Sequence, residues 1–207
     1  EGAASVASNV DVEGLQLGEN ADQGAYKKAL ENLPYFQKYG EIYGIDPYLV
    51  IALSAQESGG SHYNADGSVK EGSAIGLMQI EKTSGTRSVT AFNQETGSNE
   101  TFGASMDQLR DIEINIKWGT MNLAQTIANN DNDILSGLQA YNFGSFEGPW
   151  SIAKALAKQK KEADGVAYSN PNNPLGPYQY GDAYYVPHVL RNYASPDSPT
   201  PWVKTKD

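Results

Sequence analysis

A single stretch, residues 46–58, most constrains what this chain can fold into. Asp46-Pro47 is a strong helix start, because Asp caps free backbone N–H groups and Pro fits the first helical turn. Residues 49–55 are apolar on nearly every side of such a helix, which predicts a buried element. Gly59 would end it. The segment therefore predicts a core helix whose last turn carries one acid, Glu57.

A carboxyl in that position has a distinctive chemistry. Burial disfavours the charged form and raises the pKa of Glu57, and the negative end of the helix dipole acts in the same direction. A Glu that stays protonated near neutral pH can donate a proton to a glycosidic oxygen as the bond breaks. On position alone, a solvated Glu that merely ends a helix is the commoner case. Residues elsewhere in the chain must decide whether Glu57 is a catalytic acid or a solvated residue.

Hydrophobic periodicity predicts a chain that is mainly helical. Pro34 would end one helix or offset the next, and Ser105 with Gln108 resembles a capping box. The predicted helices, besides 46–58, cover 24–43, 105–129, 133–143, a segment opened by Pro149, and a last one from Asp182 to Tyr193.

The remaining segments are polar and rich in Gly, Ser, Thr and Asn. Residues 59–75 are predicted to be a loop, and residues 82–104 a small irregular β-region or long loop with a turn at 95–98. The fold class is therefore α+β and predominantly α-helical. One domain is expected over 24–194, between a flexible arm at 1–23 and a Pro-containing linker or tail at 195–207.

Composition narrows the function. The chain has 207 residues and a net charge of −10, which argues against nucleic acid as a partner. It has no Cys, so a disulfide scaffold and a thiolate site are excluded, and its two His residues show no zinc spacing. No metal and no cofactor are predicted. The chain begins with Glu rather than Met, which fits removal of a leader or membrane anchor.

Three short motifs occur in order: Glu57-Ser58-Gly59, Gly-Leu-Met-Gln-Ile at 76–80, and Ala-Tyr-Asn-Phe-Gly at 140–144. Together they resemble the signatures of the lysozyme-like lytic transglycosylases and goose-type lysozymes, over about residues 40–193. The ending at 180–190 is similar to the lysozyme-like domain of the bifunctional cell-wall hydrolases that Gram-positive conjugative elements carry. In those proteins a cysteine peptidase domain follows a linker.

This resemblance implies a lysozyme-like fold and cleavage of the β-1,4 bond between N-acetylmuramic acid and N-acetylglucosamine in peptidoglycan. It also implies an extracellular or cell-wall location in a Gram-positive bacterium, and conjugation or secretion machinery as a partner. By position, the resemblance implies that Glu57 is the general acid/base and that Ser58 makes a hydrogen bond near it. Met78 would pack at the site or contact sugar, and Gln79 would line the cleft. Tyr141 would stabilise the acid or the bound sugar, and Asn142 would lie beside Tyr141.

The number of catalytic carboxylates separates two mechanisms. A hydrolytic muramidase needs a second acid, whereas a lytic transglycosylase works with one. The candidates for a second acid are Asp66, Glu71, Glu81 and Asp107, and Glu81 stands where the resembled family commonly has a different residue. Three serines, Ser61, Ser68 and Ser73, compete to line the site. Two further classes stay open: a non-catalytic peptidoglycan-binding module and a structural protein of a secretion machine.

Overall fold

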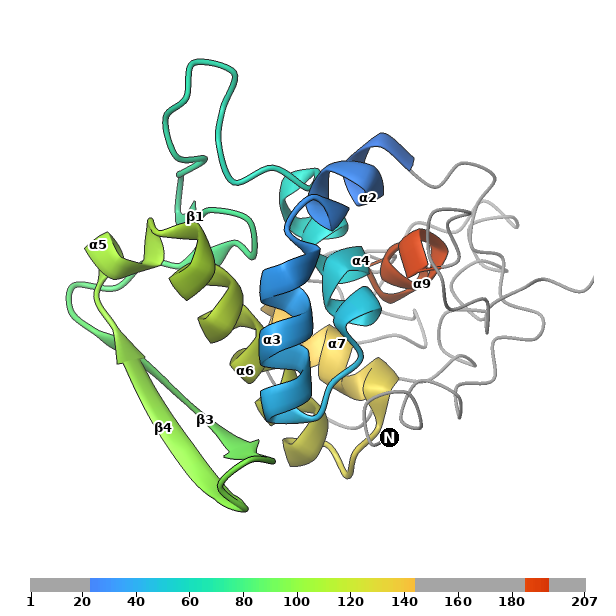
Figure 1. Cartoon of the computed structure of the whole chain (residues 1–207). Coiled ribbons are helices and arrows are strands. Elements are labelled where there is room, and N and C mark those ends of the chain that lie inside the picture. Colours follow the sequence, from blue (N-terminus) through green and yellow to red (C-terminus); the bar gives the residue numbers. More distant parts are fainter. Residues whose placement is uncertain (1–22, 144–184, 194–207) are drawn as a thin grey trace, which may run out of the picture.

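The computed structural model describes residues 23–143 and 185–193 (Figure 1). Its helices are α2 (Gln23–Leu30), α3 (Leu33–Tyr43), α4 (Pro47–Ser58), α5 (Met106–Leu109), α6 (Ile112–Asn129), α7 (Ile134–Phe143) and α9 (Tyr185–Tyr193). Its strands are β1 (Ala74–Ile75), β2 (Ile80–Glu81), β3 (Arg87–Asn93) and β4 (Ser98–Ala104). The predicted α+β, mainly helical class is confirmed.

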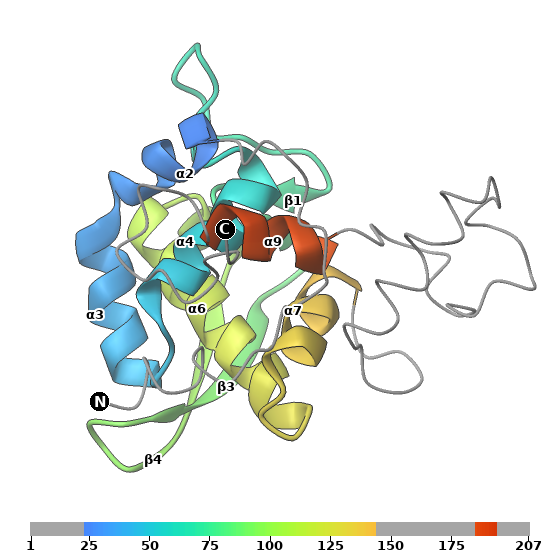
Figure 2. The same ribbon diagram turned by 90° about the vertical axis from the view of Figure 1, so that its right-hand side faces the viewer.

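Helix α4 is the centre of the molecule, as the sequence predicts. The Asp46 side chain accepts a hydrogen bond from the Tyr48 N–H at 2.9 Å, and Gly59 ends the helix in the left-handed conformation. Helices α2, α3 and α9 all pack against α4 (Figure 2). Because apolar neighbours surround it, its residues from Leu49 to Ala55 are buried. This packing fixes the direction in which the last turn of α4 presents Glu57.

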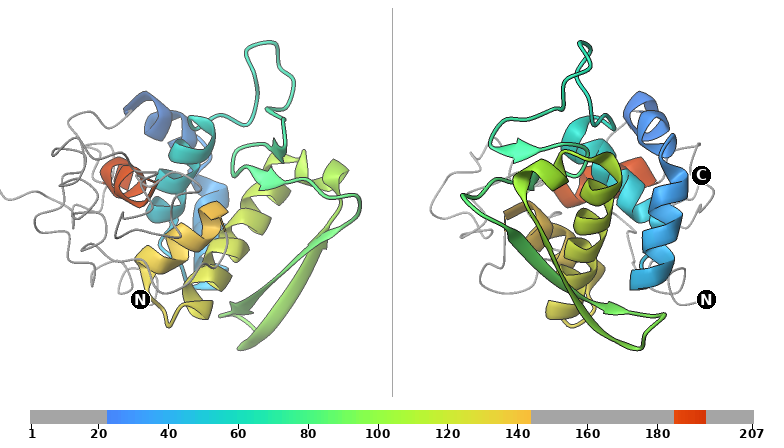
Figure 3. Two further views of the ribbon diagram at one scale, coloured as in Figure 1. Left: turned by 180° about the vertical axis from the view of Figure 1, so that it is seen from behind. Right: turned by 60° about the vertical axis from the view of Figure 1, so that its left-hand side comes forward.

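Helix α6 joins this helical core to a β-hairpin, and it packs against α3, α7 and β3 (Figure 3). The hairpin corrects the prediction of an irregular region at 82–104. Strands β3 and β4 are regular and antiparallel, with Val89 opposite Phe102, and the turn lies near the predicted place. The reason is a modest alternation in which Val89 and Ala91 face the core while their neighbours do not.

The predicted helix over 105–129 is broken into α5 and α6. The capping box of Ser105 and Gln108 forms as predicted, but it begins only one helical turn. A second cap then begins α6, because the Asp111 side chain accepts a hydrogen bond from the Ile114 N–H at 3.0 Å. Near Pro34 the structure has two helices, α2 and α3, where the sequence indicated a break.

Several expectations fall outside the described residues. They are the helix opened by Pro149, the start of the last helix near Asp182, residues 1–22 of the predicted arm and the tail at 195–207. In the part of the chain that the structure describes, no helix is both long enough and apolar enough to cross a membrane.

Candidate active site

A cavity of about 610 Å³ opens between α4, the β1–β2 region, α6 and α7. We call it the Glu57 cavity. Its walls come from segments far apart in the sequence, and they include both polar and aromatic side chains. The residues used below that line it are Glu57, Ser73, Gln79, Glu81, Arg87, Trp118, Asn122, Thr126, Tyr141 and Asn142.

The carboxyl of Glu57 is the most perturbed acid in this cavity. Burial raises its pKa to about 7, although a hydrogen bond from the Tyr185 hydroxyl to Oε1, 2.7 Å long, acts in the opposite direction. The negative charge of Glu81 is a smaller contribution to the same raised pKa of Glu57. A substantial fraction of Glu57 is therefore protonated at neutral pH, as an acid catalyst requires.

Two buried side chains hold the segment 76–80 against the core. His62 accepts a hydrogen bond from the Leu77 N–H at Nδ1 (3.0 Å), and its Nε2 lies 2.8 Å from the Arg110 carbonyl oxygen. Burial lowers the pKa of His62, which matches a neutral ring that accepts at one nitrogen and donates at the other. His62 is buried, although the sequence places it in a polar loop.

Asn115 is the second of these side chains. Its Oδ1 accepts from the Met78 N–H at 2.9 Å, and its Nδ2 donates to the carbonyls of Ile75 (3.0 Å) and Leu109 (2.9 Å). The segment also lies very close to α6, since a Cβ added at Gly119 would be 2.6 Å from Cγ of Met78. The next residue, Gln79, has a positive φ of 49° and lines the cavity.

The residues of the third motif reach the same cavity from α7. Tyr141 donates a hydrogen bond to the Met78 carbonyl at 2.6 Å, which ties α7 to the segment 76–80. The hydrogen bond to the Glu57 carboxyl comes from Tyr185. The role implied for Tyr141, stabilisation of the acid or the bound sugar, stays a prediction. Among the described residues, Oδ1 of Asn142 is buried without a hydrogen-bond partner. An unsatisfied acceptor in a cavity wall is suited to bind a substrate hydroxyl or amide.

Two of the six residues implied for the site do not line the cavity. The hydroxyl of Ser58 donates back to the Ser54 carbonyl at 3.0 Å inside α4, because its side chain lies on the buried face of the helix. The Met78 side chain is fully buried, so of its two implied roles the structure shows packing only. The cavity does include Ser73, whereas Ser61 and Ser68 bond within their own loop.

Most candidates for a second carboxylate are occupied elsewhere. Asp66 accepts hydrogen bonds from Ser68, and Asp107 pairs with Arg110. Glu71 binds Arg110 and Lys82, and these hydrogen bonds lower its pKa to about 2. Of the four, Glu81 alone lines the cavity. Its side chain is 78% exposed and lies 3.7 Å from the Arg87 guanidinium.

Trp118, Asn122 and Thr126 of α6 form a further wall of the cavity. None of the three motifs contains these residues. Their spacing of four residues places them on one helical face, and this spacing was the available signal. Arg87 lies beside them, with its guanidinium 5.1 Å from the Trp118 ring and its carbonyl accepting from the indole N–H at 3.1 Å. A cation is thus fixed in the wall by an aromatic ring.

Residues 34–166 match the family described as Transglycosylase SLT domain. The chain belongs to this family. It is similar to the endo-type membrane-bound lytic murein transglycosylase A of Cronobacter sakazakii, with 27% identity over 84% of this chain and 77% of that protein. It is also similar to the protein of the same name from Enterobacter sp. strain 638, with 25% identity and the same coverage.

Replacing Tyr185 with Phe should raise the pKa of Glu57. The lost hydrogen bond favours the carboxylate, and a hydrogen bond to a charged group accounts for about one pKa unit or more. The loss of activity at high pH should then move to higher pH. A pH–rate profile measures this shift. Tyr193→Phe, on the same helix but bonded to Asp46, is the control. An unmoved profile for Tyr185→Phe contradicts the assignment.

Proposed function

We propose that this chain cleaves the β-1,4 bond between N-acetylmuramic acid and N-acetylglucosamine in peptidoglycan as a lytic transglycosylase, with Glu57 as its single general acid and base. Family membership and the two relatives support the reaction, since both relatives are named as lytic murein transglycosylases. One observation carries the assignment of the acid: Glu57 lies in the wall of a saccharide-sized cavity with its pKa raised to about 7.

The chemistry needs one carboxyl in two states. Protonated Glu57 gives its proton to the glycosidic oxygen, and the bond from that oxygen to C1 of the muramic acid breaks. The resulting carboxylate takes the proton of the muramic acid 6-hydroxyl as that oxygen bonds to C1. The product is a 1,6-anhydro end, and Glu57 is protonated again. A pKa near the working pH serves both steps.

Product analysis tests this proposal against hydrolysis. Purified peptidoglycan is digested with the wild-type chain, and the new ends are identified by mass spectrometry. We expect 1,6-anhydromuramic ends. Free reducing ends, which contain one additional water, would instead establish a hydrolytic muramidase. The second candidate deserves this test because Glu81 shares the cavity with Glu57.

Glu81→Gln separates an electrostatic role of Glu81 from a catalytic one. If Glu81 only raises the pKa of Glu57, its neutralisation lowers that pKa. The loss of activity at high pH then begins at lower pH, by about half a unit at most for so exposed a charge. The products should remain anhydro ends. A pH–rate profile with product analysis measures both, and near-complete loss of activity at every pH would make Glu81 a catalytic acid.

We also propose action at the cell wall, in keeping with the peptidoglycan substrate. The similarity of residues 180–190 to the cell-wall hydrolases of Gram-positive conjugative elements supports a finer assignment. On that assignment, the chain works with conjugation machinery beside a C-terminal peptidase domain. Tyr185, which lies within this segment, donates to Glu57. The full-length gene in its genomic context would decide this, because neighbouring conjugation genes are required by the proposal.

A further inference from the structure

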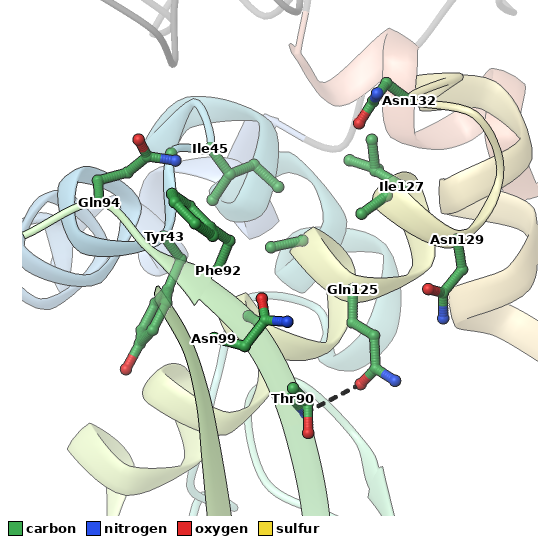
Figure 4. Close-up of a pocket in the computed structure, with 14 residues that line it drawn as sticks. Tyr43, Ile45, Thr90, Phe92, Gln94, Asn99, Gln125, Ile127, Asn129 and Asn132 are labelled. Atoms are coloured by element: carbon green, nitrogen blue, oxygen red, sulfur yellow. Dashed lines mark hydrogen bonds between the residues drawn. The ribbon is translucent and has the colours of Figure 1, made fainter. Parts of the chain in front are cut away.

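A second cavity, of about 500 Å³, lies away from Glu57 (Figure 4). The end of α3 with the α3–α4 connection, strands β3 and β4, and the end of α6 surround it. We call it the Phe92 cavity. Not one of its lining residues is charged, although the chain carries a net charge of −10. Its polar side chains carry amides and hydroxyls: Tyr43, Thr90, Gln94, Asn99, Gln125, Asn129 and Asn132.

Phe92 gives this cavity an aromatic surface. Its side chain is 48% exposed, and among the described residues only Tyr63, at 46%, is another exposed large hydrophobic side chain. In the hairpin register Phe92 pairs with Asn99, so the ring and the amide lie next to each other on one face. An aromatic face beside an amide fits a sugar ring, because the C–H groups pack on the aromatic ring while the hydroxyls accept and donate hydrogen bonds.

The edge of β3 that faces away from β4 carries backbone groups beside this cavity. The N–H of Thr90 donates to Oε1 of Gln125 at 3.2 Å, and the N–H of Gln94 donates to the Ile42 carbonyl at 2.7 Å. Both bonds point away from β4. Since N–H and C=O groups alternate sides along a strand, those of Phe92 are directed to the same edge. A donor and an acceptor together match the C=O and N–H of an N-acetyl group.

We propose that the Phe92 cavity binds an uncharged N-acetylhexosamine unit of a glycan strand, separately from the cavity where the strand is cut. The two cavities lie on two sides of α6, since Asn122 and Thr126 face the Glu57 cavity while Gln125 and Asn129 face the other. One ligand can therefore bind without filling the other site. The choice of a glycan strand as ligand rests on the proposed function, whereas the neutral, amide-rich lining is independent of it.

The test is an NMR titration of the ¹⁵N-labelled Glu57→Gln variant with chitotetraose. This variant is used so that the ligand is not consumed. We expect shift changes at the amides of Phe92, Asn99 and Gln125, as well as at Gln79 and Asn122 in the Glu57 cavity. Adding Phe92→Ala should weaken binding at the Phe92 cavity by about threefold to tenfold and leave binding at the Glu57 cavity unchanged. Adding Tyr63→Ala, which removes an equally exposed aromatic ring, should change neither.

The outcomes distinguish this inference from the proposed function. Shift changes confined to Gln79 and Asn122 overturn the second site and leave the proposed function standing. Changes confined to the Phe92 cavity support the second site and count against the Glu57 cavity as a sugar site. Unchanged amides in both cavities overturn the second site. Equal weakening by Phe92→Ala and Tyr63→Ala also overturns it, because the effect would then be unspecific.

Discussion

Glu57→Gln is expected to lower the rate of peptidoglycan cleavage by about a thousandfold or more while leaving the protein folded. Glutamine has nearly the same shape but can neither donate the proton at the start of the reaction nor take one at its end. General acid–base catalysis contributes about 10²–10⁴-fold, and in a mechanism with one carboxyl both steps depend on the same group. The rate is measured as release of anhydromuramic products from purified cell walls.

The matched control is Glu95→Gln, which makes the same change at an exposed residue outside the Glu57 cavity. It should keep the wild-type rate. Thermal unfolding of Glu57→Gln should resemble that of the wild type, because much of Glu57 is already neutral at neutral pH. A variant that clears cell walls at a rate close to wild type would show that another group protonates the leaving oxygen.

The sequence indicated this acid because its surroundings are encoded locally. The N-cap at Asp46, the apolar run from Leu49 to Ala55 and the ending at Gly59 lie within one short segment, and each feature acts over a few residues. Short motifs then placed Gln79, Tyr141 and Asn142 near Glu57, and all three line its cavity. A motif carries three-dimensional information only for the residues that it contains.

Long-range contacts account for what the sequence did not show. Tyr185 is 128 residues from Glu57 and reaches it because α9 packs on α4. Nothing in the residues around Tyr185 indicates which acid it meets. The role of His62 could not be predicted for the same reason, since its partners Leu77 and Arg110 belong to other segments. A polar residue in a loop looks solvated until the tertiary structure supplies its hydrogen bonds.

Asn115→Leu is expected to lower the free energy of unfolding by roughly 3 to 6 kcal/mol. The side chain is completely buried and satisfies the Met78 N–H together with the carbonyls of Ile75 and Leu109. Leucine fills a similar volume and satisfies none of them, and each unsatisfied buried polar group costs about 1–3 kcal/mol. For a domain of this size the midpoint of thermal unfolding should fall by about 10 °C or more.

Activity should fall with stability in this variant, because the three hydrogen bonds also fix the backbone that places Gln79 at the cavity and the Met78 carbonyl against Tyr141. Below its unfolding temperature, Asn115→Leu should therefore remain slower than wild type. Calorimetry and the cell-wall assay, both run on the same sample, separate the two effects. Asn129→Leu makes the same substitution at an exposed position of α6 and should unfold near the wild-type temperature. If Asn115→Leu also unfolds near the wild-type temperature, the buried hydrogen bonds do not hold the segment 76–80 in place.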